Sequence, residues 1–218
     1  MYIRSEHRLS ARDDAFGLIE SRPLGAWVCQ CPDGLVANHV PFLLDRGRGA
    51  SGSLLGHVSR ANDVWRAIGS GAPCVVMFSG AQAYITPNWY PGRDAHGRVV
   101  PTWNYVSVHV HGVARAIEDP AWIRDLLDRL AATHETGQPR PWAPAQAPAA
   151  YIERELRAIV GIEIAIDRIE GKLKASQDEA MADRLGTVRG LRAAHGDESH
   201  ALAELVARAI ADDTTQEG

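Results

Sequence analysis

The length and charge of this chain restrict the number of its domains and the classes of partner that it can bind. With 218 residues, 45% of them hydrophobic, it can bury one sizeable core, and a second domain would have to be small. Its formal net charge of -4 at pH 7 gives no support to direct DNA binding, because domains that bind nucleic acids usually carry a strongly basic face. The sequence has no apolar segment of the ~18 residues that span a membrane and no signal-type segment at Met1 to His7, so we expect a cytoplasmic protein without a membrane partner.

Cysteine and lysine are both scarce. The three cysteines, Cys29, Cys31 and Cys74, are odd in number and lack CxxC spacing, which argues against a disulfide framework and a structural zinc site. We expect them to be reduced and buried. Only two lysines occur among the 23 basic residues, at Lys172 and Lys174. Either a compact ammonium group is needed there, or the pair lies by chance on a solvated turn.

The first hundred residues favour one helix followed by short strands. Ser10 and Asp13 precede an apolar periodicity that predicts an N-capped helix ending near Ser21. Segments bounded by Gly and Pro predict strands at 26–30, 35–44, 53–57 and 73–79, with one or two helical turns at 62–68 and a turn-rich loop at 86–101. Several strands of this spacing indicate a barrel or a sandwich.

From Thr102 to Ile117 the sequence alternates over a length that is unusual for a strand. Val106, Val108 and Val110 point to one side and belong in a core. The opposite face carries Trp103, Tyr105, Ser107, His109 and His111. This mixed aromatic and polar face suits a ligand site or a subunit interface, or else a half-exposed strand with ordinary amphipathic side chains.

The last hundred residues alternate helical patterns with one more strand. Asp119 and Pro120 begin a helix predicted over 120–133, and a proline-rich surface crossing follows at 137–148. A helix at 151–159 precedes a core strand through Ile162, Ile164 and Ile166. Helical patterns then cover 179–194 and 199–211. We predict a main domain over 1–178 and a C-terminal helical extension over 179–218.

Four short stretches combine glycine, polar and aromatic residues with a cation in positions between the predicted strands. The stretch 56–62, GHVSRAN, offers a guanidinium, a hydroxyl and free backbone N–H groups, which suit a phosphate, although it also reads as a turn with a helix cap from Asn62. The stretches 83–90 and 100–105 put aromatic and amide side chains at strand ends, which suits a flat heteroaromatic ligand or simple core packing. Core packing explains Thr102 and Asn104 less well, because buried polar groups need partners. The fourth stretch, 169–178, contains both lysines.

In this order, the four stretches resemble the PaiB family of FMN-binding negative transcriptional regulators. The resemblance extends from Met1 to about Leu191, and His39 to Phe42 and Trp142 also fall where that family has similar residues. The chain departs from the family pattern at Ser59, Asp63, Thr86 and Asp178.

The resemblance implies an α+β fold: a mostly antiparallel FMN-binding split β-barrel, like that of pyridoxamine-phosphate oxidase, with flanking helices and a helical C-terminal segment. It further implies a homodimer with FMN between the subunits and a role in repressing transcription. By the same resemblance, His57, Ser59, Arg60 and Asn62 fall at the FMN phosphate, and Asn38, His39 and Val40 border the isoalloxazine. Thr102, Trp103, Asn104 and Tyr105 would lie at the flavin or across the dimer seam, and Lys172, Ser176 and Gln177 are candidate donors to the flavin O2 edge or the phosphate.

Two other functions stay open on the sequence. One is a flavin-dependent oxidoreductase that moves electrons from NAD(P)H to a small acceptor, and the other is storage of a flavin or tetrapyrrole without catalysis. No GxGxxG nucleotide-binding pattern and no obvious catalytic acid or nucleophile favours the enzyme.

Metal and DNA sites receive weak support. His109 and His111 have a spacing that some metal sites use, but no acidic or cysteine partner follows them, so we predict no metal. The arginines of the C-terminal helices, Arg184, Arg189 and Arg192, are diluted by acidic neighbours. DNA is therefore a possible partner that the net charge does not support, and contact could be direct or through a partner protein.

Overall fold

A computed structural model describes residues 1–9 and 11–216. They divide into two compact units, which are described separately. The barrel unit comprises Ile19–Phe78 and His109–Ile169, and the strand-end unit comprises Met1–Leu18, Ser79–Val108 and Glu170–Gly218.

Seven strands and seven α-helices are found in the described part of the chain. The strands are β1 (Leu24–Cys31), β2 (Gly34–Pro41), β3 (Leu43–Asp45), β4 (Ser53–Ser59), β5 (Ala72–Ile85), β6 (Thr102–Ile117) and β7 (Ile159–Lys174). The helices are α1 (Arg12–Ser21), α2 (Val64–Ala67), α3 (Gly92–His96), α4 (Pro120–Glu135), α5 (Ala149–Arg157), α6 (Met181–Ala193) and α7 (Asp197–Gln216), with short 3-10 turns η1 (Ser5–His7), η2 (Pro87–Trp89) and η3 (Pro144–Gln146).

The barrel unit holds part of every strand. The strands form one sheet in the order β2-β1-β5-β6-β7-β4-β3, and β1 pairs antiparallel with both β2 and β5. The edge strand β2 also packs against β4, which is not its hydrogen-bonded neighbour. At the contact, a Cβ atom on Gly56 would lie only 2.9 Å from Val40 Cγ1 and 3.0 Å from Phe42 Cδ1. Glycine is therefore required where the sheet curls onto itself.

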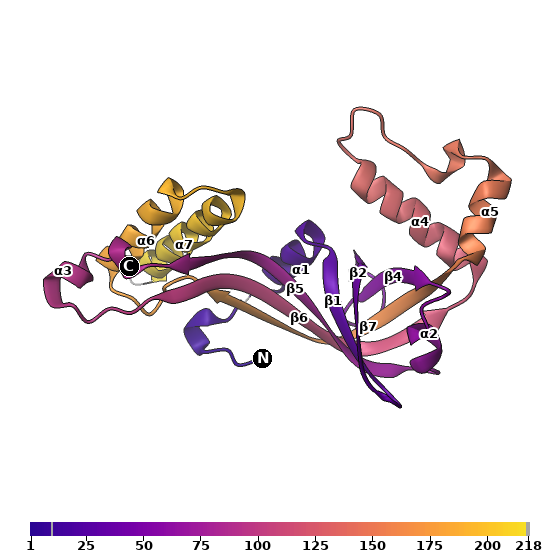
Figure 1. Cartoon of the computed structure of the whole chain (residues 1–218), viewed down its shortest axis with the longest axis horizontal. Helices are drawn as coiled ribbons and strands as arrows, with labels where there is room; N and C mark the ends of the chain where they lie inside the picture. Colours follow the sequence, from indigo (N-terminus) through magenta and orange to yellow (C-terminus); the bar gives the residue numbers. More distant parts are fainter. Residues whose placement is uncertain (10, 217–218) are drawn as a thin grey trace. The chain divides into compact units, whose positions relative to one another are not determined.

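Helix α4 packs on β4 in the barrel unit, and α5 packs against α4 (Figure 1). The start of α4 is fixed by Asp119, whose side chain accepts a hydrogen bond from the backbone N–H of Ala121, as the sequence predicts. Leu126 and Leu130 pack on Leu55 of β4. Ile123 packs on α5, so that each face of α4 has its own apolar partner.

In the strand-end unit, α6 and α7 lie against the ends of the long strands (Figure 1). Their shared core includes Ala81 and Ile85 of β5, Leu191 of α6, and Leu202 and Val206 of α7. Helices α6 and α7 thus share a core with the strand ends. A search for a helix both long and apolar enough to cross a membrane finds none in the described residues.

Most predicted elements are present. The stretch predicted as a turn-rich loop at 86–101 also contains the short helix α3, and two predicted strands differ in their bounds. The segment predicted as one strand at 35–44 forms two strands, because it changes partner at Phe42: β2 pairs with β1 as far as Pro41, opposite Leu24, whereas β3 pairs with β4 from Leu43, opposite Leu55. The strand predicted to end at Ser79 continues to Ile85 as β5. Gly80 permits this, because a Cβ there would meet Val106 Cγ1 at 2.5 Å. The predicted N-cap Ser10 lies outside the described residues.

Candidate functional site

The residues predicted to bind FMN fall half in the barrel unit and half in the strand-end unit. The barrel group comprises Asn38, His39, Val40, His57, Ser59, Arg60 and Asn62. The strand-end group comprises Thr102, Trp103, Asn104, Tyr105, Lys172, Ser176 and Gln177.

The turn that follows β4 is tied to β2 by two asparagines. Asn62 Nδ2 donates to Asn38 Oδ1 at 2.7 Å, although the two residues are 24 positions apart. Asn62 Oδ1 accepts from the backbone N–H of Val64 at 3.1 Å, and Ser59 Oγ accepts from that of Ala61 at 3.3 Å. The structure therefore brings the two predicted segments of the barrel group together, and Asn62 also serves as the cap of α2.

Two polar atoms of the barrel group are buried without a partner among the described residues. They are Asn38 Nδ2 and His57 Nδ1. Burial lowers the pKa of His57, so its imidazole is neutral at neutral pH. A buried polar atom without a hydrogen bond is costly, and such atoms are rare in native proteins unless a water or a ligand completes them. These two atoms mark the place where the barrel group can receive a ligand.

The other members of the barrel group differ in exposure. Val40 is buried at 3% exposure and supplies an apolar wall, whereas the His39 side chain is exposed. Arg60 is partly exposed, and its Nη1 donates to Glu118 Oε2 at 2.6 Å. Its Nε and Nη2 donate to the carbonyls of Arg157 and Ile159. In the structure this guanidinium is thus held toward the start of α4 and the end of α5, and no sequence motif links Arg60 to these distant partners.

The strand-end group is centred on a buried hydrogen bond. Asn104 Nδ2 donates to Ser176 Oγ at 2.8 Å, and these side chains are exposed by only 0% and 1%. Asn104 Oδ1 is buried without a partner among the described residues. Ser176 has a φ of 59°, a left-handed conformation that costs energy in a residue other than glycine. Gln177 closes the same turn, because it accepts from the N–H of Ala175 and donates to the carbonyl of Leu173.

Both lysines lie beside this turn. Lys172 Nζ lies 5.2 Å from the ring centre of Tyr105 and donates to the Tyr2 carbonyl. Lys174 donates to the hydroxyl of Thr102. Each ammonium therefore has a specific contact with β6 or the N-terminal segment, which favours the first of the two explanations for their retention.

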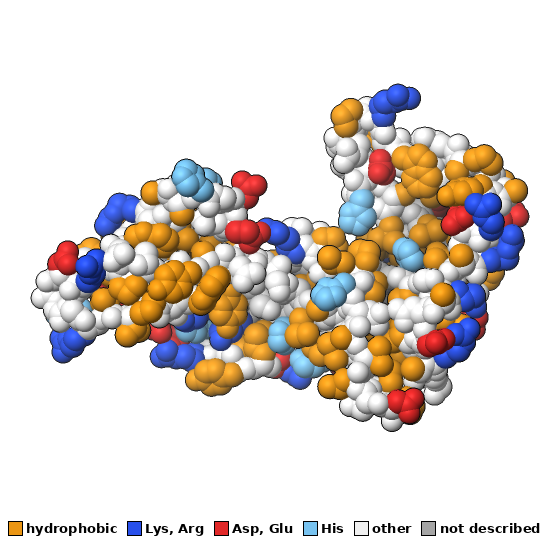
Figure 2. Space-filling model, viewed as in Figure 1, with side chains coloured by type: hydrophobic (Ala, Val, Ile, Leu, Met, Phe, Trp, Pro, Cys, Tyr) orange, Lys and Arg blue, Asp and Glu red, His pale blue; other side chains and the backbone are white. Residues whose placement is uncertain are grey.

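An aromatic surface extends from the same strands. Trp103 and Tyr84 pack edge to face, with ring centres 6.2 Å apart, yet they remain 55% and 49% exposed. Figure 2 shows hydrophobic side chains gathered over this end of β5 and β6. Large aromatic side chains exposed together in this way are typical of a surface that another molecule covers.

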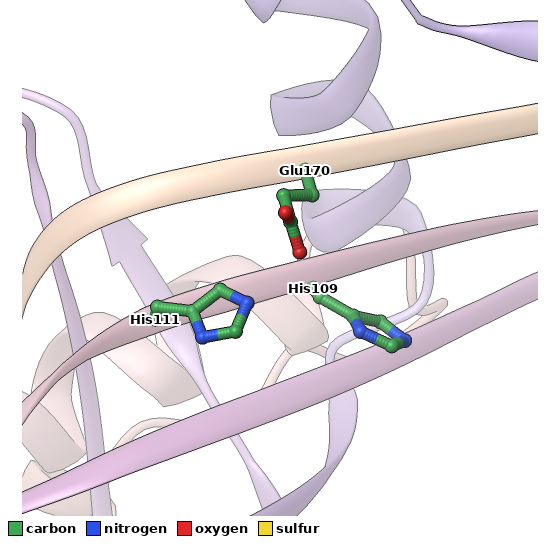
Figure 3. A group of neighbouring side chains, drawn as sticks. All are labelled: His109, His111 and Glu170. Carbon is green, nitrogen blue, oxygen red and sulfur yellow. The ribbon is translucent and has the colours of Figure 1, made fainter. Parts of the chain in front are cut away.

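The histidine pair of β6 lies as its spacing predicts. Figure 3 shows His109 and His111, which project from the same face of the strand in the barrel unit. Glu170, drawn with them, belongs to the strand-end unit, where its carboxylate pairs with the ammonium of Met1 at 2.7 Å.

None of the cysteines is in a disulfide. Cys29 and Cys31 are buried with their sulfur atoms 3.7 Å apart. Burial raises the pKa of Cys29 to about 12 and that of Cys74 to about 11. Both thiols are therefore protonated at neutral pH. The expectation that all three cysteines are buried is wrong for Cys74, which is only partly buried.

Comparison with known proteins assigns the fold and its cofactor. A family model described as "Putative FMN-binding domain" matches residues 1–168. The chain belongs to this family. The family confirms the predicted cofactor, FMN. The fourth motif at 169–178 and helices α6 and α7 lie beyond the matched range.

Two relatives of this FMN-binding family span nearly the whole chain. An uncharacterized protein of Emericella nidulans is 29% identical, over 94% of this chain and 96% of its own. "Protease synthase and sporulation protein PAI 2" of Bacillus subtilis is 26% identical over the same shares. The resemblance to the PaiB family is thereby confirmed.

A solved structure supports the fold class. The FAD- and heme-binding protein of Mycobacterium smegmatis has a TM-score of 0.58 at 21% identity, covering 89% of this chain and 79% of its own. The predicted α+β split-barrel fold is confirmed.

The barrel group fits FMN on two observations. A flavin offers carbonyl and ring-nitrogen acceptors along one edge and acceptor oxygens on its phosphate, so it can complete an amide donor such as Asn38 Nδ2. It can also complete the neutral imidazole of His57, which donates or accepts according to its tautomer. The turn at 59–62 is already ordered by Asn38, so little conformational entropy is lost on binding.

Proposed function

We propose that this protein is an FMN-binding negative transcriptional regulator of the PaiB type that works as a cytoplasmic homodimer. The flavin part rests on one observation above all, the buried unpartnered atoms Asn38 Nδ2 and His57 Nδ1 in the segments that the family resemblance assigns to FMN. The regulatory part rests on the likeness to the Bacillus subtilis protein over almost the full length of both chains. The free cysteines suit the reducing cytoplasm.

In this proposal the chain binds and orients the flavin. Asn38 and His57 would complete the polar groups of the cofactor, and Asn62 holds the turn beside them. Bound FMN supplies a ring that can take up electrons, so that its occupancy or redox state is available as a signal. Cys29 and Cys74 offer no thiolate nucleophile at neutral pH, because burial raises their pKa values to about 12 and about 11.

We further propose that the regulator reaches DNA through a partner protein. Two arginines of α6 are already paired with acidic residues of α7, Arg184 with Asp213 at 2.7 Å and Arg192 with Glu204 at 2.9 Å. With a net charge of -4 for the whole chain, this helix offers little to the phosphates of DNA.

The proposed homodimer would use the exposed Tyr84 and Trp103. Aromatic side chains are enriched at the centres of subunit interfaces, where they bury large areas at low entropic cost. Light scattering should give about twice the chain mass of 23.7 kDa. A mass near 23.7 kDa at micromolar concentration would contradict the dimer.

The decisive experiment combines flavin binding with two functional assays. The purified protein is titrated with FMN by fluorescence quenching, then assayed for NAD(P)H oxidation with and without small acceptors. In parallel, transcripts of cells lacking the gene are compared with those of cells expressing the wild type or Asn38→Ala. A regulator predicts FMN binding, negligible NAD(P)H turnover and a set of transcripts that rise in the deletion strain. Rapid NAD(P)H oxidation with unchanged transcripts would establish the oxidoreductase instead.

A further inference from the structure

The barrel unit contains a cavity of about 670 Å³ between the β4–α2 turn, the start of α4 and the length of α5. This volume lies within the range of small-molecule sites in proteins. We call it the arm pocket. Its floor includes the buried side chains of Ile123 and Leu156, which are exposed by only 1% and 7%. Its wall on the β4 side is the ion pair between Arg60 and Glu118.

The arm pocket does not have the chemistry of the flavin site. No amide, hydroxyl or aromatic side chain lines it, so it offers nothing that matches the hydrogen-bonding edge or flat ring of an isoalloxazine. Asn38 and His57, which hold the unpartnered buried atoms of the barrel group, are absent from its lining. Arg60 is the single predicted flavin residue that the pocket includes.

Its charges favour an anion. The lining contains three arginines and two glutamates, so its formal charge is 3 - 2 = +1. Arg60 is neutralised by Glu118, but the guanidinium groups of Arg124 and Arg157 have no ion pair or hydrogen bond among the described residues. Figure 2 shows charged side chains of both signs next to hydrophobic ones around α5. Free guanidinium groups above an aliphatic floor match a carboxylate that carries an apolar body.

We propose that the arm pocket binds a small monocarboxylate with an apolar body, at a site separate from the flavin. The carboxylate is held by Arg124 and Arg157 at the rim, and the hydrocarbon part lies on Ile123 and Leu156. Glu153, also at the rim, opposes a second negative charge on the ligand. The site therefore selects monoanions of modest length over phosphates and dicarboxylates.

The proposal can be tested by calorimetric titration of the full chain saturated with FMN. The probes are hexanoate, octanoate and decanoate, with 1-octanol and octylammonium as controls that keep the apolar body and change the head group. We expect octanoate to bind more than tenfold more tightly than either control. Each added CH2 should tighten binding about fourfold while the floor can still cover it. 4-Phenylbutyrate tests whether a ring is accepted in place of a chain.

Variants then assign the site. Arg124→Gln and Arg157→Gln should each weaken octanoate about tenfold and leave octanol unchanged, and both positions are exposed enough to be replaced without loss of folding. Arg189→Gln, an exposed arginine in the strand-end unit, is the matched control and should have no effect.

Three outcomes would overturn the proposal. Equal affinity for octanoate, octanol and octylammonium would show unspecific apolar binding. Unchanged octanoate affinity in both rim variants would place the ligand elsewhere. Octanoate binding that occurs in the FMN-free chain but is abolished in the FMN-saturated chain would show that the pocket belongs to the flavin.

Discussion

Replacing Asn38 separates ligand binding from stability, because its two side-chain atoms have different roles. In the free protein, Asn38 Oδ1 accepts one hydrogen bond from Asn62 at 2.7 Å, while Nδ2 is buried without a partner. Asn38→Ala removes a bond worth about 1 kcal/mol but also removes an unsatisfied donor whose burial costs about 1–3 kcal/mol. These effects oppose each other, so the thermal midpoint of the free protein should change by no more than a few degrees.

FMN affinity should respond differently. If Nδ2 donates to the flavin, the variant loses about 1 kcal/mol of binding energy, which is about a fivefold increase in Kd. Fluorescence quenching gives the Kd, and the rise of the thermal midpoint with FMN gives an independent value. Gln138→Ala removes an exposed amide side chain of the barrel unit that is outside the predicted site and should leave both unchanged. A large fall in the midpoint of the free protein with an unaltered Kd would refute the reasoning and make Asn38 a purely structural residue.

Three further changes test the barrel unit. In a urea titration, Gly112→Ala should destabilise the protein by roughly 1–3 kcal/mol or more, because the new Cβ would lie 2.1 Å from the Ala165 carbonyl oxygen. The control Gly17→Ala in α1, where a Cβ would have no atom within 4 Å, should be neutral or stabilising. Arg60→Ala should weaken FMN about tenfold and leave riboflavin, which lacks the phosphate, unchanged; an equal loss for both ligands would show that Arg60 does not hold the phosphate. The free energy of unfolding should fall as the pH rises from about 9 toward 12, because the folded state keeps the Cys29 thiol protonated, with its pKa raised from 9.0 to about 12, whereas the unfolded chain ionises it. Urea midpoints at pH 8, 9 and 10 should decline less in Cys29→Ala, and parallel curves would contradict this assignment.

Local sequence patterns predict a helix or strand correctly where the residues of that element alone determine its bounds. The alternation from Thr102 to Ile117 gives the bounds of β6, and the Asp119–Pro120 pair marks the start of α4. The predicted bounds are wrong where contacts between residues far apart in the sequence determine the structure. Gly80 looks like the end of a strand in sequence, but it lets β5 continue past Val106, where any side chain would collide.

The same limit applies to the site. The resemblance to the PaiB family brought Asn38 and Asn62 into one predicted group, and their hydrogen bond confirms that they meet. The partners of Arg60 were not foreseeable, because Glu118 and the Arg157 carbonyl are 58 and 97 positions away. The arm pocket was missed for the same reason: its lining is drawn from three segments with no shared motif.

The confinement of lysine to the end of β7 has a practical consequence for handling this protein. Reagents that modify primary amines of side chains can react only at Lys172 and Lys174, and the barrel unit, which contains no lysine, is left chemically untouched. Amine coupling to a sensor chip would therefore attach the molecule through these two lysines or through the amino group of Met1, which all belong to the strand-end unit, while Asn38, His57 and the arm pocket stay unmodified.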